Sequence, residues 1–244
     1  EDGSEVERTH GRYLRFMESK NREVRQAAFE AMYFTYEQWK NTLATTYTAA
    51  VKKTLFFAKT RKYPSSLEAA LDVDNVRPEV YHNLIEAVHE SLPLFYRYMR
   101  LRKQMLGVDE LHMYDIYVPL VKDLDMEIPP EKAVEMVKEG LAPLGEQYLA
   151  DLSRGLTEGW IDWFENKGKT SGAYSASVYR VHPYVLLNYD NTVDDMFTLA
   201  HEMGHAMHSF YSDQNQEFVN ADYTIFVAEG ASTVNECLVM NDLL

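Results

Sequence analysis

The sequence predicts a mainly α-helical fold, with a helical body and a small β-sheet beside a helix that carries two histidines. Apolar residues return at three- and four-residue steps through most of residues 1–165. Two short runs rich in β-branched and aromatic residues follow, at 174–179 and 181–189. A further helical pattern then carries two histidines separated by three residues, His201 and His205. Together these observations indicate helices, a small sheet, and a helical end that bears the chemistry.

The composition is that of an ordinary folded protein and excludes several classes. The chain has 244 residues, of which 46% are hydrophobic and 13% aromatic. Its formal net charge of −14 argues against nucleic acid or an anionic membrane as a partner, because phosphate binding depends on clustered Lys and Arg. The sequence has no apolar run of the roughly 18 residues that a membrane span needs. One cysteine, Cys237, and an acidic start unlike a signal peptide predict a cytoplasmic protein.

The helical body is expected to occupy residues 1–165. Residues 5–62 predict one long helix or two helices joined by a kink, because the apolar pattern is continuous and helix breakers are scarce. Ser65 or Ser66 is expected to cap a short helix, since a serine oxygen can accept the free amide protons of a first turn. A third helix is predicted over 77–106.

An irregular stretch is expected at 107–129, where Asp, Pro and aromatic residues gather. A helix should begin at Pro130, because proline is tolerated in the first turn. Helices are then expected through about Glu165, with breaks near Pro143 and Gly155.

Residues 166–244 form the expected catalytic segment. Within it, Thr192 followed by Asp195 resembles a capping box, which predicts the start of a helix. His201 and His205 then stand one turn apart on the same helix face. Two imidazoles in that arrangement, an H-E-x-x-H pattern, can bind a single zinc ion.

Glu202 lies beside the predicted metal, where a carboxylate can take a proton from zinc-bound water. The metzincin pattern is excluded, because His208 stands at its glycine position and Tyr211 at its last histidine position. His208 also lies about 10.5 Å further along the helix axis than His201, too far to share one ion. We expect it to support a ligand, to face substrate, or to be a histidine at the edge of the core.

The third ligand is expected to be a later acid on a second helix. Asp213 and Glu217 lie in a polar, turn-like segment, and Asp222 is expected at the N-cap of that helix. Glu229 and Glu236 remain, seven residues apart on one face. Apolar neighbours favour Glu229, because a metal would compensate its carboxylate there. Glu236 would then orient a histidine ligand through a hydrogen bond.

Several segments resemble the oligoendopeptidase F branch of the thimet-oligopeptidase-like zinc metallopeptidases. The signature helices of that branch are similar to HEMGHAMHS at 201–209 and FVAEGASTVNE at 226–236. Further similar segments are ELHMYD at 110–115, GAYS at 172–175 and HPYVLLNY at 182–189. The resemblance therefore covers nearly the whole chain.

The resemblance implies a zincin-like fold and a zinc metalloendopeptidase acting on short peptides. It implies one zinc ion per chain, held by His201, His205 and Glu229, with Glu202 as the general base. The body at 1–165 would form a wall of a deep substrate channel. Because the family places further active-site His and Tyr groups downstream, we expect the chain to be incomplete at its C-terminus. The missing C-terminal half would then be a partner, and the chain alone would turn over poorly.

One residue departs from the family's pattern. Gly230 stands where the family is expected to have a small residue with a side chain, which weakens the ligand helix slightly. Tyr174 begins a run that can pair with an extended peptide and face the substrate. The alternatives are a zinc carboxypeptidase of related fold and a non-catalytic helical module with a vestigial metal site.

Overall fold

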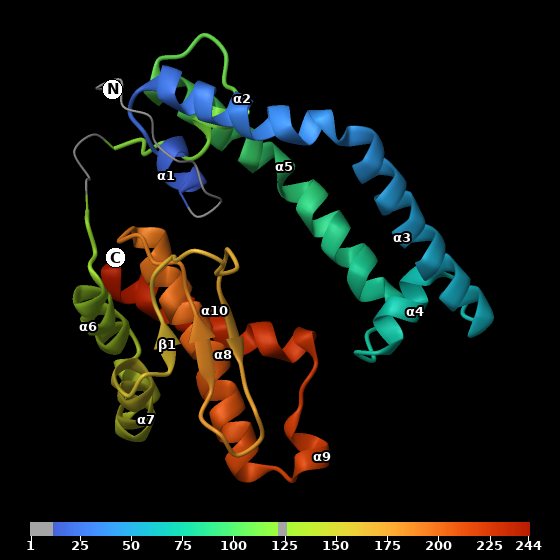
Figure 1. The fold of residues 1–244 in the computed structure, drawn as a ribbon, viewed down its shortest axis with the longest axis vertical. Helices are drawn as coiled ribbons and strands as arrows, with labels where there is room; N and C mark the ends of the chain where they lie inside the picture. Colours follow the sequence, from blue (N-terminus) through green and yellow to red (C-terminus); the bar gives the residue numbers. More distant parts are fainter. Residues whose placement is uncertain (1–11, 122–125) are drawn as a thin grey trace. The chain divides into compact units, whose positions relative to one another are not determined.

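The structure is a computed structural model that describes residues 12–121 and 126–244 (Figure 1). The chain divides into two compact units, Glu1–Leu124 and Asp125–Leu244. The sequence suggested a boundary at 165/166 instead, and the proposed wall of a substrate channel stays a prediction. Within both units helices predominate and only a small sheet is found among the described residues, which confirms the predicted fold class.

The first unit consists of helices, and its described part before residue 62 has three of them where the sequence predicted one or two. Its elements are α1 (Tyr13–Met17), α2 (Arg22–Gln38), α3 (Lys40–Thr60), α4 (Ser66–Asp72), α5 (Pro78–Leu106) and the 3₁₀ turn η1 (Met113–Asp115). The helical pattern before residue 62 is therefore divided into three helices, with Trp39 between the last two. Ser65 caps α4 as expected, because its Oγ accepts a hydrogen bond of 3.2 Å from the backbone N–H of Glu68.

A buried carboxylate, Asp115, ties α2 to the segment that follows α5. Its two oxygens accept hydrogen bonds from Arg22 and Arg25, the latter at 2.8 Å. Burial by itself raises the pKa of Asp115, but these guanidinium bonds outweigh it and lower the pKa to about 2. Arg102 of α5 donates to the backbone carbonyl of Asp115, at 2.9 Å. The cluster thus joins α2, α5 and the segment that follows α5 through buried hydrogen bonds.

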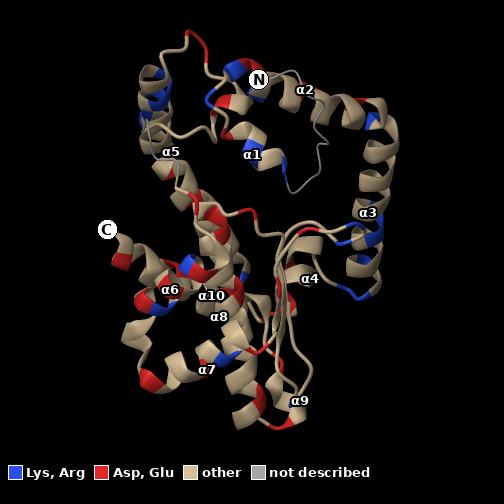
Figure 2. Cartoon of the chain, turned by 60° about the vertical axis from the view of Figure 1, so that its left-hand side comes forward, with Lys and Arg blue, Asp and Glu red and all other residues tan. Residues whose placement is uncertain are grey.

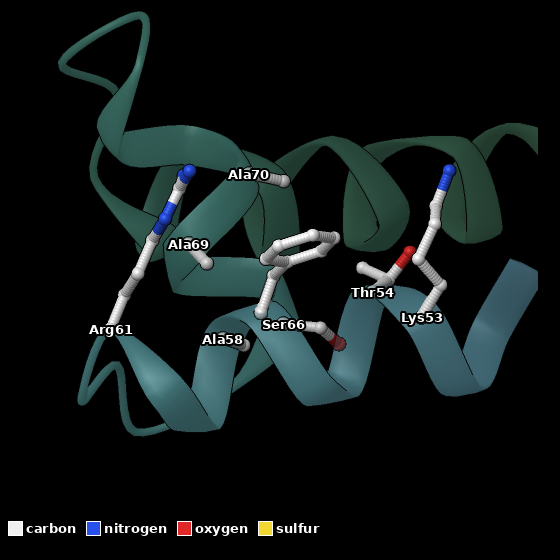
Figure 3. A pocket seen from close by; sticks show the side chains of 8 residues that line it. Lys53, Thr54, Ala58, Arg61, Ser66, Ala69 and Ala70 are labelled. Carbon is white, nitrogen blue, oxygen red and sulfur yellow. The ribbon is translucent and has the colours of Figure 1, made fainter.

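A pocket of about 250 Å³ lies between α3 and α4. Figure 3 shows Lys53 of α3 and Arg61, the residue after its last turn, on either side of it, with Ala69 and Ala70 of α4 between them. The residues that line it include none of those predicted for the metal site. The pocket is therefore not part of the candidate site.

The second unit holds the sheet and the helices that carry the sequence motif. Its elements are α6 (Pro130–Gly140), the 3₁₀ turn η2 (Ala142–Leu144), α7 (Glu146–Thr157), β1 (Ile161–Asp162), β2 (Tyr174–Ala176), β3 (Tyr184–Leu186), α8 (Val193–Asn215), α9 (Phe218–Ala221) and α10 (Ile225–Leu243). The expectation of helices through about Glu165 is wrong, because α7 ends at Thr157 and β1 follows; the break expected near Gly155 lies at this helix end, and Gly155 itself is inside α7. Glycine fits at this position because a Cβ would lie 2.7 Å from the Met203 side chain and 2.9 Å from the Trp160 ring.

The sheet has the strand order β1-β3-β2, so β2 is an edge strand. β3 pairs with β1 in parallel, Ile161 opposite Val185, and with β2 in antiparallel, Ser175 opposite Val185. The short strand β1 was not predicted, because two residues carry no periodic pattern. The expected runs at 174–179 and 181–189 contain β2 and β3, but each strand is only three residues long.

The apolar core of the second unit surrounds α8. Helices α6, α7 and α10 and strands β2 and β3 all contact α8 (Figure 1). Fully buried side chains on α8 include Met196, Leu199 and Met203, and Val239 of α10 is buried as well. Gly140 of α6 permits a close approach, because a Cβ there would lie 2.7 Å from the Cα of Val239. The motif helix is therefore held on several sides by packed elements.

Charged residues of both signs occur on the helices, with Lys and Arg marked on α3 and α5 and acidic residues in both units (Figure 2). In the part of the chain that the structure describes, no helix combines the length and the apolar character needed to cross a membrane.

Candidate metal centre

Helix α8 begins where the sequence predicted and places its histidines one turn apart. Thr192 Oγ1 accepts a hydrogen bond from the backbone N–H of Asp195, and Asp195 Oδ2 accepts one from the backbone N–H of Thr192. This capping box satisfies amide groups that have no partner inside the helix. Just over two turns in, His201 and His205 project from the same face.

Helix α10 packs against α8, which it crosses in Figure 1, and it carries the candidate acids. It begins at Ile225 with Thr224 at its N-cap, so the expectation of an N-cap at Asp222 is wrong. The two helices touch at Gly204, where a Cβ would lie 2.7 Å from the Cα of Ser232. Glycine is required at this contact, because any side chain would meet the backbone of α10.

Three donor atoms from the two helices converge. His201 Nε2 and His205 Nε2 lie 3.1 Å apart, and Glu229 Oε2 lies 3.5 Å from each of them. Two ligands of a tetrahedral zinc ion, each about 2.0 to 2.2 Å from it, are separated by roughly 3.3 to 3.5 Å. The donor set and its spacing therefore fit a zinc ion. Among the described residues, His201, His205 and Glu229 are the one group of three possible metal ligands whose donor atoms lie this close together.

The other acid on α10, Glu236, contacts the far side of a histidine. Its Oε1 lies 2.6 Å from Nδ1 of His201. Because a carboxylate accepts hydrogen bonds, this contact favours the His201 tautomer with its proton on Nδ1, which leaves the Nε2 lone pair for a metal. Glu236 thus has the orienting position that the sequence offered as its alternative role.

Glu202 lies below the surface next to the cluster. It is buried, and its Oε2 has no hydrogen-bond partner among the described residues. Burial raises the pKa of Glu202, the positive charge that His201 can carry lowers it, and the charge of Glu229 raises it further. The backbone of Ser175, on edge strand β2, also hydrogen-bonds to this carboxylate. A buried carboxylate with one unused oxygen is suited to proton transfer.

His208 does not reach the three donor atoms. Its ring stacks on Tyr223, with 3.8 Å between ring centroids, and the Tyr223 hydroxyl lies 2.6 Å from Ser209 Oγ. The buried Nδ1 of His208 has no hydrogen-bond partner within the described ranges. Burial lowers the pKa of both His205 and His208, which favours neutral rings. His208 thus packs against the segment that precedes α10.

Tyr174 is half exposed on β2, the strand that brings Ser175 to Glu202. Its role toward a substrate stays a prediction.

Two residues of the site escaped sequence reasoning. Asn235 of α10 is buried, accepts a hydrogen bond from the Tyr148 hydroxyl and donates one to the carbonyl of Ala200 at 3.1 Å. Ser232, also fully buried, donates to Glu229 Oε2. Its spacing of three residues after a candidate ligand was the available signal, since residues i and i+3 are neighbours on a helix.

Comparison with known proteins decides the family. The sequence pattern of peptidase family M3 matches residues 15–244. The chain belongs to peptidase family M3. Within the family it is 50% identical to oligopeptidase PepF of Bacillus subtilis, over the whole chain and 36% of that relative. It is 46% identical to the chromosomal oligoendopeptidase F of Lactococcus lactis subsp. cremoris, over 99% of the chain and 40% of the relative.

A solved structure agrees with this assignment. The crystal structure of oligoendopeptidase-F from Enterococcus faecium superposes with a TM-score of 0.63 at 35% identity, over the whole chain and 36% of its own. The predicted resemblance to the oligoendopeptidase F branch is thus confirmed. This M3 chain spans 36 to 40% of the length of these relatives.

Proposed function

We propose that this M3 chain holds one zinc ion through His201, His205 and Glu229 and contributes it to the hydrolysis of internal bonds in short peptides. The observation that supports the proposal most is the convergence of the three donor atoms within 3.5 Å of one another. Membership of a peptidase family and relatives named oligopeptidase or oligoendopeptidase support the reaction class. A zinc ion in such a site lowers the pKa of bound water and polarises a carbonyl.

The residues of the chain have separate tasks in this proposal. Glu236 fixes the tautomer of His201 through Nδ1, so that Nε2 points to the site. Glu202 accepts a proton from the attacking water at Oε2 and passes it to the leaving amine. Burial keeps the basicity of Glu202 higher than that of an exposed carboxylate.

The substrate would lie along edge strand β2. An extended peptide can add to a sheet edge by main-chain hydrogen bonds, and Ser175 of this strand already reaches Glu202. Such binding favours short flexible peptides, because they can adopt the extended conformation along their whole length. Tyr174, half exposed on the same strand, would contact the substrate.

We further propose that turnover depends on parts of the polypeptide outside these 244 residues. The chain spans 36 to 40% of its relatives, and helix α10 exposes large apolar side chains. These are Ile225, Phe226, Val227, Val234, Met240 and Leu243. An apolar surface of this kind usually marks a contact with another chain or segment. The remaining part of the polypeptide would cover it and supply further groups that bind the developing oxyanion.

The proposal is tested by metal binding and by peptide cleavage. Zinc content is measured for the chain and for the variants Glu229→Ala and Glu217→Ala, of which the second removes an exposed acid at the start of α9. We expect about one zinc per chain, lost in Glu229→Ala and kept in Glu217→Ala. Equal losses in the two variants would contradict the ligand assignment.

Cleavage is measured with blocked and unblocked quenched peptides, using the chain alone and the chain with the remaining polypeptide. We expect cleavage only when the remaining polypeptide is present, and we expect blocked peptides to be cleaved. In the same mixture, the variant Glu202→Gln should retain zinc while its kcat falls by about 10² to 10⁴. Cleavage restricted to free C-termini would favour a carboxypeptidase. Zinc binding without any cleavage would favour a vestigial site in a helical module.

A further inference from the structure

Glu229 is the least constrained of the three candidate ligands. Its side chain is 49% exposed, whereas those of His201 and His205 are 28% and 17% exposed. A long and half-exposed side chain occupies several rotamers, and holding it in one of them costs conformational entropy. Something must therefore select the rotamer that brings Oε2 to the two histidines.

Ser232 contacts the oxygen that faces the histidines. Its Oγ donates to Glu229 Oε2 at 3.0 Å and lies 3.1 Å from the backbone carbonyl of the same residue. Oε2 is also the atom that lies 3.5 Å from Nε2 of His201 and of His205. A carboxylate oxygen has two lone-pair directions, so it can accept from the serine and face a metal at once.

The position of Ser232 is itself fixed by the helix that carries the histidines. Ser232 is fully buried. A Cβ on Gly204 would lie only 2.7 Å from the Cα of Ser232. Helices α8 and α10 are therefore in direct backbone contact at this residue. Gly204 lies between His201 and His205 in the sequence. The contact at Gly204 therefore fixes Ser232, and through its hydrogen bond Glu229, relative to the two histidines.

We propose that Ser232 is a positioning residue that holds Glu229 Oε2 toward His201 and His205 before the metal binds. This inference rests on the proposed zinc site and adds a residue to it. When the Glu229 side chain turns away, the serine hydroxyl still has the backbone carbonyl as its partner. The hydroxyl is therefore satisfied in both states, and its contribution appears in metal binding and not in the fold.

The test compares Ser232→Ala with a matched control, Thr233→Ala. Thr233 is the next residue on α10, and its hydroxyl donates to the same backbone carbonyl of Glu229 without a hydrogen bond to the carboxylate. The probe is Zn²⁺, with affinity measured by competition with a chelator of known affinity. Visible absorption of the Co²⁺-loaded chain reports the ligand geometry, and circular dichroism follows the unfolding of the metal-free chain.

We expect Ser232→Ala to bind Zn²⁺ about 10-fold more weakly, the lower end of the usual 10- to 100-fold effect of such partners, because Glu229 is half exposed. The Co²⁺ spectrum should change, while the unfolding temperature of the metal-free variant matches that of Thr233→Ala. Ser232→Gly lacks the same hydroxyl and should lose the same affinity. In a Glu229→Ala background, Ser232→Ala should have no further effect.

Two results would overturn the inference. One is wild-type Zn²⁺ affinity and an unchanged Co²⁺ spectrum in Ser232→Ala, and the other is an equal loss of affinity in Thr233→Ala. Failure of the unmodified chain to bind Zn²⁺ would instead overturn the proposed function, together with this inference. The two failures are thus told apart by the unmodified chain.

Discussion

Replacing Gly204 with alanine should separate the two helices that carry the candidate ligands. The new Cβ would lie 2.7 Å from Ser232 Cα, 2.9 Å from Ala231 O and 3.0 Å from Ser232 N. All three are backbone atoms of α10, so no rotation of a side chain can relieve the overlap. Ordinary contacts between carbon atoms are about 3.5 to 4.0 Å, so α10 must move by roughly 1 Å.

The expected loss of stability follows from two opposing effects. Overpacking of this kind costs about 1 to 3 kcal/mol or more. Alanine recovers about 1 kcal/mol relative to glycine inside a helix. Because the overlap is with backbone atoms, the upper part of that range applies, about 2 to 3 kcal/mol. The net loss should then be about 1 to 2 kcal/mol, which lowers the unfolding temperature of a chain of this size by roughly 2 to 8 °C. A displacement of about 1 Å would also take Glu229 out of range of the histidines, as the donor distances are already 3.5 Å.

The matched control is Gly230→Ala, on α10 itself. A Cβ at Gly230 meets nothing within 4 Å, so this variant gains the helix propensity of alanine without a clash. Thermal unfolding and Zn²⁺ competition are measured for both variants. We expect Gly204→Ala to unfold earlier and to bind Zn²⁺ at least about 10-fold more weakly, and Gly230→Ala to unfold about 2 to 4 °C later with unchanged affinity. Wild-type behaviour of Gly204→Ala would refute the argument that this glycine sets the distance between the helices.

Two further predictions concern stability. Because Arg22 and Arg25 hold the pKa of Asp115 at about 2, below its ordinary value of 3.8, its charge stabilises the folded chain above about pH 4. The difference in free energy of unfolding between the wild type and Asp115→Asn, measured in urea, should be constant above pH 4 and shrink as the pH falls toward 2; a difference independent of pH would contradict this. Thr192→Ala removes the acceptor for Asp195 N–H at the start of α8 and should cost about 1 kcal/mol in the same assay, whereas Thr192→Ser should cost little.

Local signals in the sequence were reliable wherever the structure depends on neighbouring residues. The capping box at Thr192, the cap at Ser65 and the shared face of His201 and His205 all involve residues within four positions of one another. Such contacts form inside one helix turn, so the order of residues specifies them directly. The strand β1 and the burial of Asn235 could not be predicted, because each depends on elements distant in the sequence.

The sequence by itself determined that two histidines share a helix face and that Glu229 and Glu236 share a face of another. It did not determine which acid meets which nitrogen, because residues seven apart on a helix are equivalent in direction. The contact of α8 with α10 at Gly204 decides this: it brings Glu229 Oε2 to Nε2 of both histidines and Glu236 to Nδ1 of His201. The physical reason is that helix geometry fixes the direction of a side chain, whereas the packing of two helices fixes the distance between side chains that they carry.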